Sequence, residues 1–238
     1  MLACVLLAVA SCTSDVDDTQ SRQSRTGSTS STTAPTLAPE ASTPNPPRPS
    51  FDGRIEPISE ADRGRMTHSW RPGCPVPIED LRLLTLDHWG YDGAEHQGEL
   101  VVHADYSDGM LSVFRMLFDA RFPIERMQLV DIYDADDHAS TLANNTAAFN
   151  CRAVVGRPGS WSEHAFGRAI DINPRVNPYV LDPRIQHPAL APYLDRSRQE
   201  PGIIQPGDTA VQAFATIGWL WGGTWSSPDY QHFSATGR

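Results

Sequence analysis

Two short segments of the sequence combine histidine with carboxylate residues at spacings that suit a metal site. In the first, His164 and Asp171 lie seven residues apart, separated by a glycine and a short apolar stretch. In the second, His232 follows Asp229 by three residues. Two histidines and one aspartate suit zinc, and three protein ligands leave a fourth tetrahedral position for water, as in catalytic sites. We therefore predict that the two histidines and Asp171 bind a metal ion, with Asp229 placed as a base toward that water.

The pattern around these residues resembles a known family. From Ser162 to Asp171 the sequence reads Ser-x-His-x-x-Gly-x-Ala-x-Asp, and an acidic residue, two others, a histidine and an aromatic residue follow downstream. This two-part motif resembles the zinc D-alanyl-D-alanine peptidases, which include VanY-type carboxypeptidases, vancomycin-resistance dipeptidases and L-alanyl-D-glutamate endolysins. The resemblance covers roughly residues 70–238, and residues 144–152 look like an actinobacterial branch.

The resemblance implies a site and a substrate class. It implies one Zn²⁺ per chain on His164, Asp171 and His232, with Asp229 as the general base. It also implies an arginine that holds the carbonyl or carboxylate of the substrate; Arg152 is the best match, and pairing with surface carboxylates is the equal alternative. The implied substrates are peptidoglycan stem peptides, cut at a D-Ala-D-Ala or an L-Ala-D-Glu bond.

Two other function classes remain open from the sequence. One is a non-catalytic module that keeps the zinc and binds cell-wall peptides. The other is an exported adhesion or structural protein in which the histidine and aspartate residues are accidental. The carboxylate of Asp229 favours the enzyme, because a site that has lost activity does not need an acid three residues before a ligand.

Composition excludes several chemistries. The 238 residues include 19 basic and 29 acidic side chains, for a net charge of −10, and all the basic ones are arginine. Without lysine there is no Walker-type phosphate loop, no Ser-x-x-Lys acyl transferase and no pyridoxal Schiff base. An acidic chain without basic clusters is also a poor binder of nucleic acid.

The chain divides into three parts by composition. Residues 1–12 form an apolar stretch ending at Cys12, which resembles a lipoprotein signal; a buried strand with an incidental cysteine is the alternative. Residues 13–52 are predicted to be a disordered tether, because 22 of the 38 residues from 13 to 50 are Ser, Thr or Pro. Residues 53–238 form the folded domain. We expect a monomer in the cell envelope, anchored to the outer face of the cytoplasmic membrane by a lipid on Cys12, or secreted.

The remaining cysteines are consistent with export. Cys74 and Cys151 form an even pair in the mature chain, which predicts a disulfide. A nucleophilic Cys151 with His164 as its base is the alternative.

Hydrophobic periodicity predicts an α+β fold with a small, largely antiparallel sheet flanked by helices, and the resemblance implies the fold shared with the Hedgehog signalling domain. Of three tryptophans near the C-terminus, we expect two in the core and one at the site. The acidic run Asp134, Asp136 and Asp137 is predicted to be a solvated turn. The predicted strands are residues 81–87, 99–104, 127–133, 148–155, 169–172 and 231–234, and the predicted helices are 108–122, 139–148 and 209–217, the last capped by Asp208 and ended by Gly218.

The anchor can be tested in a bacterial host. Cys12→Ser should release the protein from the membrane fraction, because residues 13–50 have no apolar surface with which to hold on to a bilayer. Immunoblotting of membrane and soluble fractions measures this, and a variant that stays with the membrane would indicate a longer, uncleaved helix upstream instead.

Overall fold

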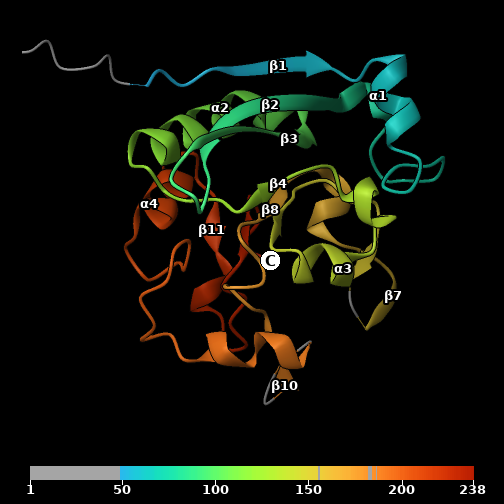
Figure 1. Cartoon of the computed structure of the whole chain (residues 1–238). Helices are drawn as coiled ribbons and strands as arrows, with labels where there is room; N and C mark the ends of the chain where they lie inside the picture. Colours follow the sequence, from blue (N-terminus) through green and yellow to red (C-terminus); the bar gives the residue numbers. More distant parts are fainter. Residues whose placement is uncertain (1–48, 155, 182–183, 186) are drawn as a thin grey trace, which may run out of the picture. The chain divides into compact units, whose positions relative to one another are not determined.

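The protein has an α+β fold built from small sheets and short helices, as the sequence predicts (Figure 1). The computed structural model describes residues 49–154, 156–181, 184–185 and 187–238. The predicted signal and all but the last residues of the predicted tether lie outside the described residues. Among the helices that are described, none has both the length and the apolar character needed to cross a bilayer.

The elements follow one another without a regular alternation of strand and helix; η denotes a 3-10 helix. In chain order they are β1 (Gly53–Pro57), α1 (Glu60–Arg65), η1 (Ile78–Asp80), β2 (Leu81–Trp89), β3 (Glu95–His103), α2 (Ala104–Asp119), β4 (Arg126–Met127), η2 (Val130–Tyr133), α3 (Asp137–Leu142), β5 (Asn145–Thr146), β6 (Ala153–Val154), β7 (Arg157–Trp161), η3 (Glu163–Phe166), β8 (Ala169–Asp171), β9 (Val180–Leu181), β10 (Arg184–Ile185), η4 (Pro188–Leu194), α4 (Thr209–Thr216), β11 (Leu220–Trp221), η5 (Gly222–Thr224) and β12 (His232–Ser234).

The first sheet, in the order β1–β2–β3, is antiparallel and supports the rest of the domain. Leu84 and Leu86 of β2 belong to the main core together with Phe114 of α2, which lies along the sheet in Figure 1. Leu81 and Leu83 belong to a second cluster. They pack there with residues of the segment 66–77 between α1 and η1, which we call the N-terminal arm. The strand therefore buries apolar side chains on both faces, which explains why leucine is not confined to alternate positions in it.

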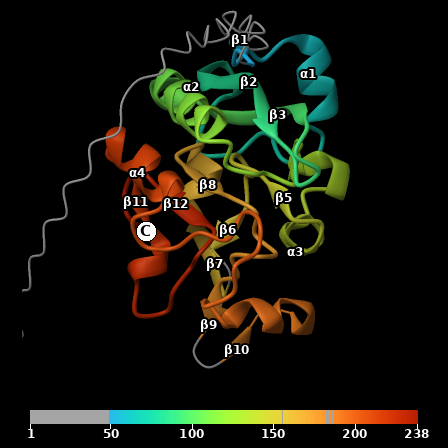
Figure 2. The same ribbon diagram turned by 60° about the vertical axis from the view of Figure 1, so that its left-hand side comes forward.

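The second sheet, in the order β11–β12–β8, carries most of the predicted site. Its strands are antiparallel, and Phe233 of β12 pairs with Ile170 of β8. Both of these side chains are fully buried in the main core. Because side chains alternate along a strand, the residues next to them face the other side of the sheet. Figures 1 and 2 both place β8 between α4 and α3.

The helices α2 and α4 confirm two predictions from periodicity, with shifted bounds. In α4, Ala210, Ala213 and Phe214 are buried, and Gly218 follows the helix with φ +76°, as a C-terminal stop requires. The predicted cap at Asp208 is wrong in one respect, because its side chain forms no capping hydrogen bond. The carboxylate instead accepts a hydrogen bond from the backbone N–H of Gln205 at 2.7 Å.

The predicted strand over residues 127–133 is wrong. Within this range only Met127, the second residue of β4, is in a strand, and Val130 begins the 3-10 helix η2. Asp131 explains the departure, since its carboxylate accepts hydrogen bonds from the backbone N–H groups of His68 and Ser69 at 2.8 and 2.9 Å. The side chain of Asp131 thus binds the N-terminal arm instead of taking its place in a strand.

The predicted strand over residues 148–155 is also largely wrong, since β6 is the only strand among the residues of this range that the structure describes, 148–154. The backbone N–H groups of this segment donate to three different parts of the chain instead of one neighbour. Phe149 donates to the carbonyl of Val101 at 3.0 Å, Asn150 to that of His164 at 3.2 Å, and Cys151 to that of Ser69 at 2.9 Å. The segment is therefore a junction between the first sheet, the site and the arm.

The predicted helix over residues 139–148 is much shorter in the structure. It begins at Asp137 and ends at Leu142, and β5 follows. Asn144 ends it by adopting φ +57°. Its buried side chain accepts a hydrogen bond from the backbone N–H of Arg175 at 2.9 Å, which favours the turn over another helical residue.

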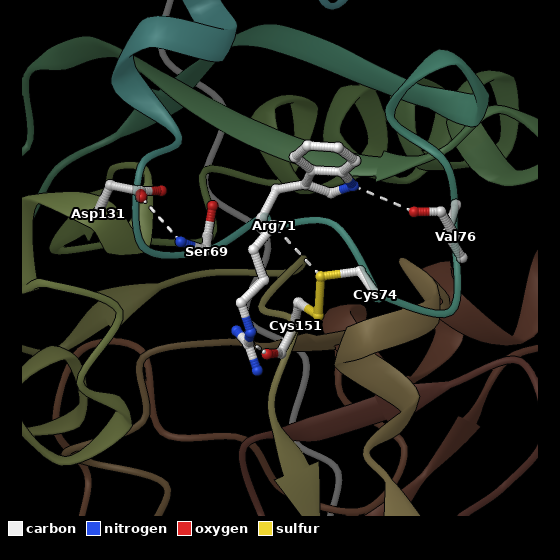
Figure 3. Close-up of a disulfide and its surroundings, with 7 residues drawn as sticks. Ser69, Arg71, Cys74, Val76, Asp131 and Cys151 are labelled. Carbon is white, nitrogen blue, oxygen red and sulfur yellow. Dashed lines mark hydrogen bonds between the residues drawn. A yellow bond between two sulfur atoms is a disulfide. The ribbon is translucent and has the colours of Figure 1, made fainter.

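The predicted disulfide between Cys74 and Cys151 is present, and it rules out Cys151 as a free nucleophile. It joins the N-terminal arm to the junction segment across 77 residues of chain (Figure 3). Arg71 adds a second connection, donating from Nη1 to the carbonyl oxygen of Cys151 at 3.0 Å. The residue that follows this double connection is Arg152.

The disulfide should be a large contributor to stability. Replacing both cysteines by serine should lower the free energy of unfolding by roughly 4–5 kcal/mol, because an open chain gains conformational entropy when unfolded. For a domain of this size the melting temperature should fall by on the order of 10 °C. Calorimetry measures the shift, and a thiol titration of the denatured, unreduced protein should find neither Cys74 nor Cys151 free. Two reactive thiols from this pair would contradict the bridge.

Candidate metal centre

The structure brings His164, Asp171 and His232 together, although they come from three separate elements. Asp171 ends β8 and His232 begins β12, and the antiparallel register places these two residues directly opposite each other. His164 is supplied by η3, whose N-terminus is capped by Ser162 and whose C-cap, Gly167, has φ +63°. All three side chains are buried, and one ligand atom from each lies within 4.8 Å of the others.

The hydrogen bonds of the two imidazoles leave one nitrogen of each facing this cluster. Nδ1 of His164 lies 2.6 Å from the carbonyl oxygen of Ala148, and Nε2 of His232 lies 3.0 Å from that of Arg238. A carbonyl oxygen only accepts, so these nitrogens carry the protons, and Nε2 of His164 and Nδ1 of His232 are the candidate ligand atoms.

The two imidazole nitrogens and the carboxylate are so close together that a proton or a metal ion must lie between them. Nε2 of His164 and Nδ1 of His232 are 3.3 Å apart, and they lie 3.3 and 3.0 Å from the two carboxylate oxygens of Asp171. Two lone pairs and a carboxylate repel one another at these distances unless a proton or metal ion is shared. A set of two imidazoles and one carboxylate fits Zn²⁺.

The electrostatics of the cluster favour this interpretation. Burial alone would raise the pKa of Asp171, but His164 and His232 lower it well below its usual value. Burial alone would lower the pKa of His164, yet the charge of Asp171 raises it. The carboxylate thus stays ionised in a buried site, where it attracts positive charge.

Asp229 lies beside this cluster without being part of it. Residues 229–232 form a turn in which the backbone N–H of His232 donates to the carbonyl of Asp229 at 3.2 Å. A hydrogen bond to Gly222 holds this turn in place: the carbonyl oxygen of Gly222 accepts it from the backbone N–H of Asp229 at 3.0 Å. A Cβ on Gly222 would lie 2.8 Å from the carbonyl oxygen of Asp229, so only glycine fits there.

The carboxyl group of Asp229 is suited to take up and release a proton. It is buried, and its Oδ1 has no hydrogen-bond partner among the residues that the structure describes. Burial raises the pKa of Asp229 to about 8, and the negative charges of Asp171 and Asp137 act in the same direction. His232 and Arg152 oppose this shift in part.

These groups line one side of a cleft of about 810 Å³. Arg152 lies in its wall and forms an ion pair with Asp137, with Nη2 of the arginine 3.0 Å from Oδ1 of the aspartate. Arg152 therefore pairs with a carboxylate, as one of the two interpretations predicts, and it also lines the cleft; its role toward a substrate stays a prediction. Trp225 lines the cleft beside the ring of His232, with centroids 5.5 Å apart.

The other two tryptophans, Trp219 and Trp221, are buried in the core, as expected. The solvated-turn prediction fails for Asp137, which faces the cleft as the partner of Arg152. Asp136 is the N-cap of α3, a role that the sequence signal of an aspartate before a helix could have suggested. Sequence reasoning also missed Tyr179 and Gln231, which line the cleft; Tyr179 belongs to no motif, and Gln231 is one of the two unspecified residues between Asp229 and His232.

The raised pKa of Asp229 predicts how the stability of the metal-free protein depends on pH. Folding raises the pKa from 3.8 to about 8, so the folded state binds this proton more tightly and stability falls as pH rises through that window. Asp229→Asn removes this loss, so metal-free Asp229→Asn should melt above metal-free wild type at pH 8, and the difference should shrink toward pH 5. Calorimetry with a chelator present measures this; the exposed Asp108→Asn is the control. A difference that grows on acidification would contradict the shift.

The comparisons with known proteins agree with this geometry. A family model described as D-alanyl-D-alanine carboxypeptidase matches residues 155–235, about a third of the 238-residue chain. The matched range contains all three candidate ligands and Asp229, whereas Arg152 lies just outside it. No curated protein and no solved structure matches the chain. Over residues 155–235 the chain is therefore similar to peptidases of the D-alanyl-D-alanine carboxypeptidase family.

Proposed function

We propose that this protein is an exported zinc peptidase that hydrolyses peptide bonds in the stem peptides of peptidoglycan. The observation that carries the proposal is the buried set of His164, Asp171 and His232 in the wall of a cleft, with the carboxyl group of Asp229 beside it. The similarity over residues 155–235 supports the reaction class and the substrate class. The bond cut would be D-Ala-D-Ala, in a carboxypeptidase, or L-Ala-D-Glu, in an endopeptidase.

The candidate ligands would hold the metal through the atoms that face one another in the cluster. These are Nε2 of His164, Nδ1 of His232 and a carboxylate oxygen of Asp171. In that position the metal would supply Lewis acidity, which polarises a scissile carbonyl and lowers the pKa of a bound water to about 7.

Asp229 is the group that moves the proton. Its carboxylate lines the cleft and would accept a proton from the attacking water and donate it to the leaving amine. A nearby positive charge lowers the pKa of a carboxyl group. A zinc ion in the site would therefore favour the ionised form of Asp229, which is the form that a base requires.

Arg152 is the candidate for holding the substrate. Its guanidinium lies in the cleft wall, and Asp137 fixes its orientation. From there it would bind a peptide carboxylate, or the oxygen of the scissile carbonyl as charge develops on it, by charge-assisted hydrogen bonds. The location proposed for this chemistry is the cell envelope, with a monomer held to the membrane by a lipid on Cys12.

A matched pair of variants tests the metal and the base separately. His164→Ala removes a ligand, so it should abolish zinc binding and turnover together. Asp229→Asn keeps all three ligands, so it should retain one zinc per chain while turnover falls by ~10²–10⁴-fold, the usual effect of losing a positioned acid or base. Elemental analysis and mass spectrometry of digested muropeptides measure the two properties.

The outcomes separate the alternatives. Full zinc content in His164→Ala would overturn the ligand assignment, and wild-type turnover in Asp229→Asn would overturn the assignment of the base. If neither wild type nor Asp229→Asn cleaves any stem peptide and both bind one, the protein is the non-catalytic wall-binding module.

A further inference from the structure

The protonated nitrogen of His232 is held by a part of the chain that the chemistry described above does not use. Nε2 of His232 lies 3.0 Å from the backbone carbonyl oxygen of Arg238, six residues further along the chain. Arg238 lies outside the range that the family model matches. Because His232, Gly237 and Arg238 all line the cleft, water is the competitor of this carbonyl for the imidazole.

The carbonyl of Arg238 matters because it fixes which nitrogen of the imidazole carries the proton. A carbonyl oxygen only accepts hydrogen bonds, whereas a water molecule donates and accepts them. Beside a carbonyl, Nε2 must donate, and Nδ1 is left with the lone pair that faces Asp171 at 3.0 Å. Beside water, either nitrogen of the ring could carry the proton. The carbonyl therefore helps to select the candidate ligand atom of His232.

Ser234 holds this carbonyl in place. Its hydroxyl donates to the carbonyl oxygen of Arg238 at 2.9 Å and accepts a hydrogen bond from the backbone N–H of the same residue at 3.1 Å. Ser234 is fully buried and lies two positions after His232 in β12, so both side chains project from the same face of the strand. One hydroxyl thus fixes both backbone polar groups of Arg238 beside the imidazole.

Residues 234–238 are also tied to η3, the 3-10 helix that supplies the other imidazole. The hydroxyl of Thr236 donates to Oε2 of Glu163 at 2.8 Å. Glu163 is the first residue of η3 and forms an ion pair with Arg168, whose backbone carbonyl accepts a hydrogen bond from the N–H of Ala235 at 3.0 Å. These bonds support the segment from the side opposite to Ser234 in sequence.

We propose that Ser234 is a positioning residue of the candidate metal centre, whose hydroxyl holds the backbone carbonyl of Arg238 against Nε2–H of His232 and so directs Nδ1 to the metal. This inference rests on the proposed function, because it takes the cluster to be a zinc site. It assigns to Ser234 no contact with metal or substrate, since the serine acts through His232.

The test compares the zinc affinity of the full-length protein with that of Ser234→Ala, by competition with a chromogenic chelator. Loss of the hydroxyl frees the carbonyl, so the dissociation constant for zinc should rise by ~10–100-fold, the usual effect of removing a group that orients a ligating histidine. Nitrogen-15 NMR of the zinc-loaded protein gives a second measurement. The Nε2–H proton of His232 should be protected from exchange with water in wild type and should exchange fast in Ser234→Ala.

A matched control separates this role from a loss of stability. Ser107 is a buried serine of α2, outside the cleft, and its hydroxyl donates to the backbone carbonyl of Ala104 at 2.8 Å. Ser107→Ala should lower the melting temperature, because a buried hydrogen bond is lost, and should leave the zinc affinity unaltered.

A second variant keeps the test decisive if Ser234→Ala does not fold. Thr236→Val changes an exposed residue and removes only the bond to Glu163, so it should fold and bind zinc several-fold more weakly than wild type. Wild-type zinc affinity in each of these variants that folds would overturn the proposal. Equal weakening in Ser107→Ala would also overturn it, because lost stability would then explain the effect.

The inference and the function on which it rests can fail separately. A protein that binds zinc but cleaves no stem peptide would lose the proposed activity, and the order of the zinc affinities would still decide the role of Ser234. Cleavage by a wild type whose zinc affinity and proton exchange match those of Ser234→Ala would keep the activity and overturn the inference. A wild type that binds no zinc would overturn both.

Discussion

The structure depends on the antiparallel pairing of His232 with Asp171. The register between β12 and β8 places a buried imidazole opposite a buried carboxylate, and the core residues Phe233 and Ile170 pair at the next position. A shift of the register by one residue would exchange the two faces, putting the apolar side chains in the cleft and the ligands in the core. Hydrophobic burial and the geometry of the candidate metal site are therefore set by the same pairing.

The third ligand and the cleft wall depend on the junction segment that leads to Arg152. Its backbone N–H groups connect the first sheet, the 3-10 helix of His164 and the N-terminal arm, and the disulfide makes the last of these connections covalent. Ala148, in the same segment, accepts the proton of His164 and so determines which nitrogen faces the cluster. The junction segment thus orients the candidate ligand His164 and places Arg152 in the wall of the cleft.

The sequence was informative where one physical signal dominated. The spacing of His164 and Asp171 predicts two of the candidate ligands, and apolar periodicity predicts α2, α4 and the short strand β8. It failed over residues 127–133 and 148–155, where apolar residues alternate as in strands but the backbone bonds are divided among distant segments. No local pattern contains that information. Asp137 and Gln231 were missed for a related reason, since each is placed in the cleft by the tertiary fold.

Gly222 has no side chain, yet it helps to determine how Asp229 lies relative to His232. The peptide of Asp229 lies against its bare Cα, and a methyl group there would meet the carbonyl oxygen of Asp229 at 2.8 Å and Cβ of His232 at 3.4 Å. A side chain at 222 would therefore press on the turn that holds Asp229 and on the first residue of β12, which pairs with Asp171. The position of Asp229 relative to the candidate ligand His232 thus depends on a residue that has no side chain.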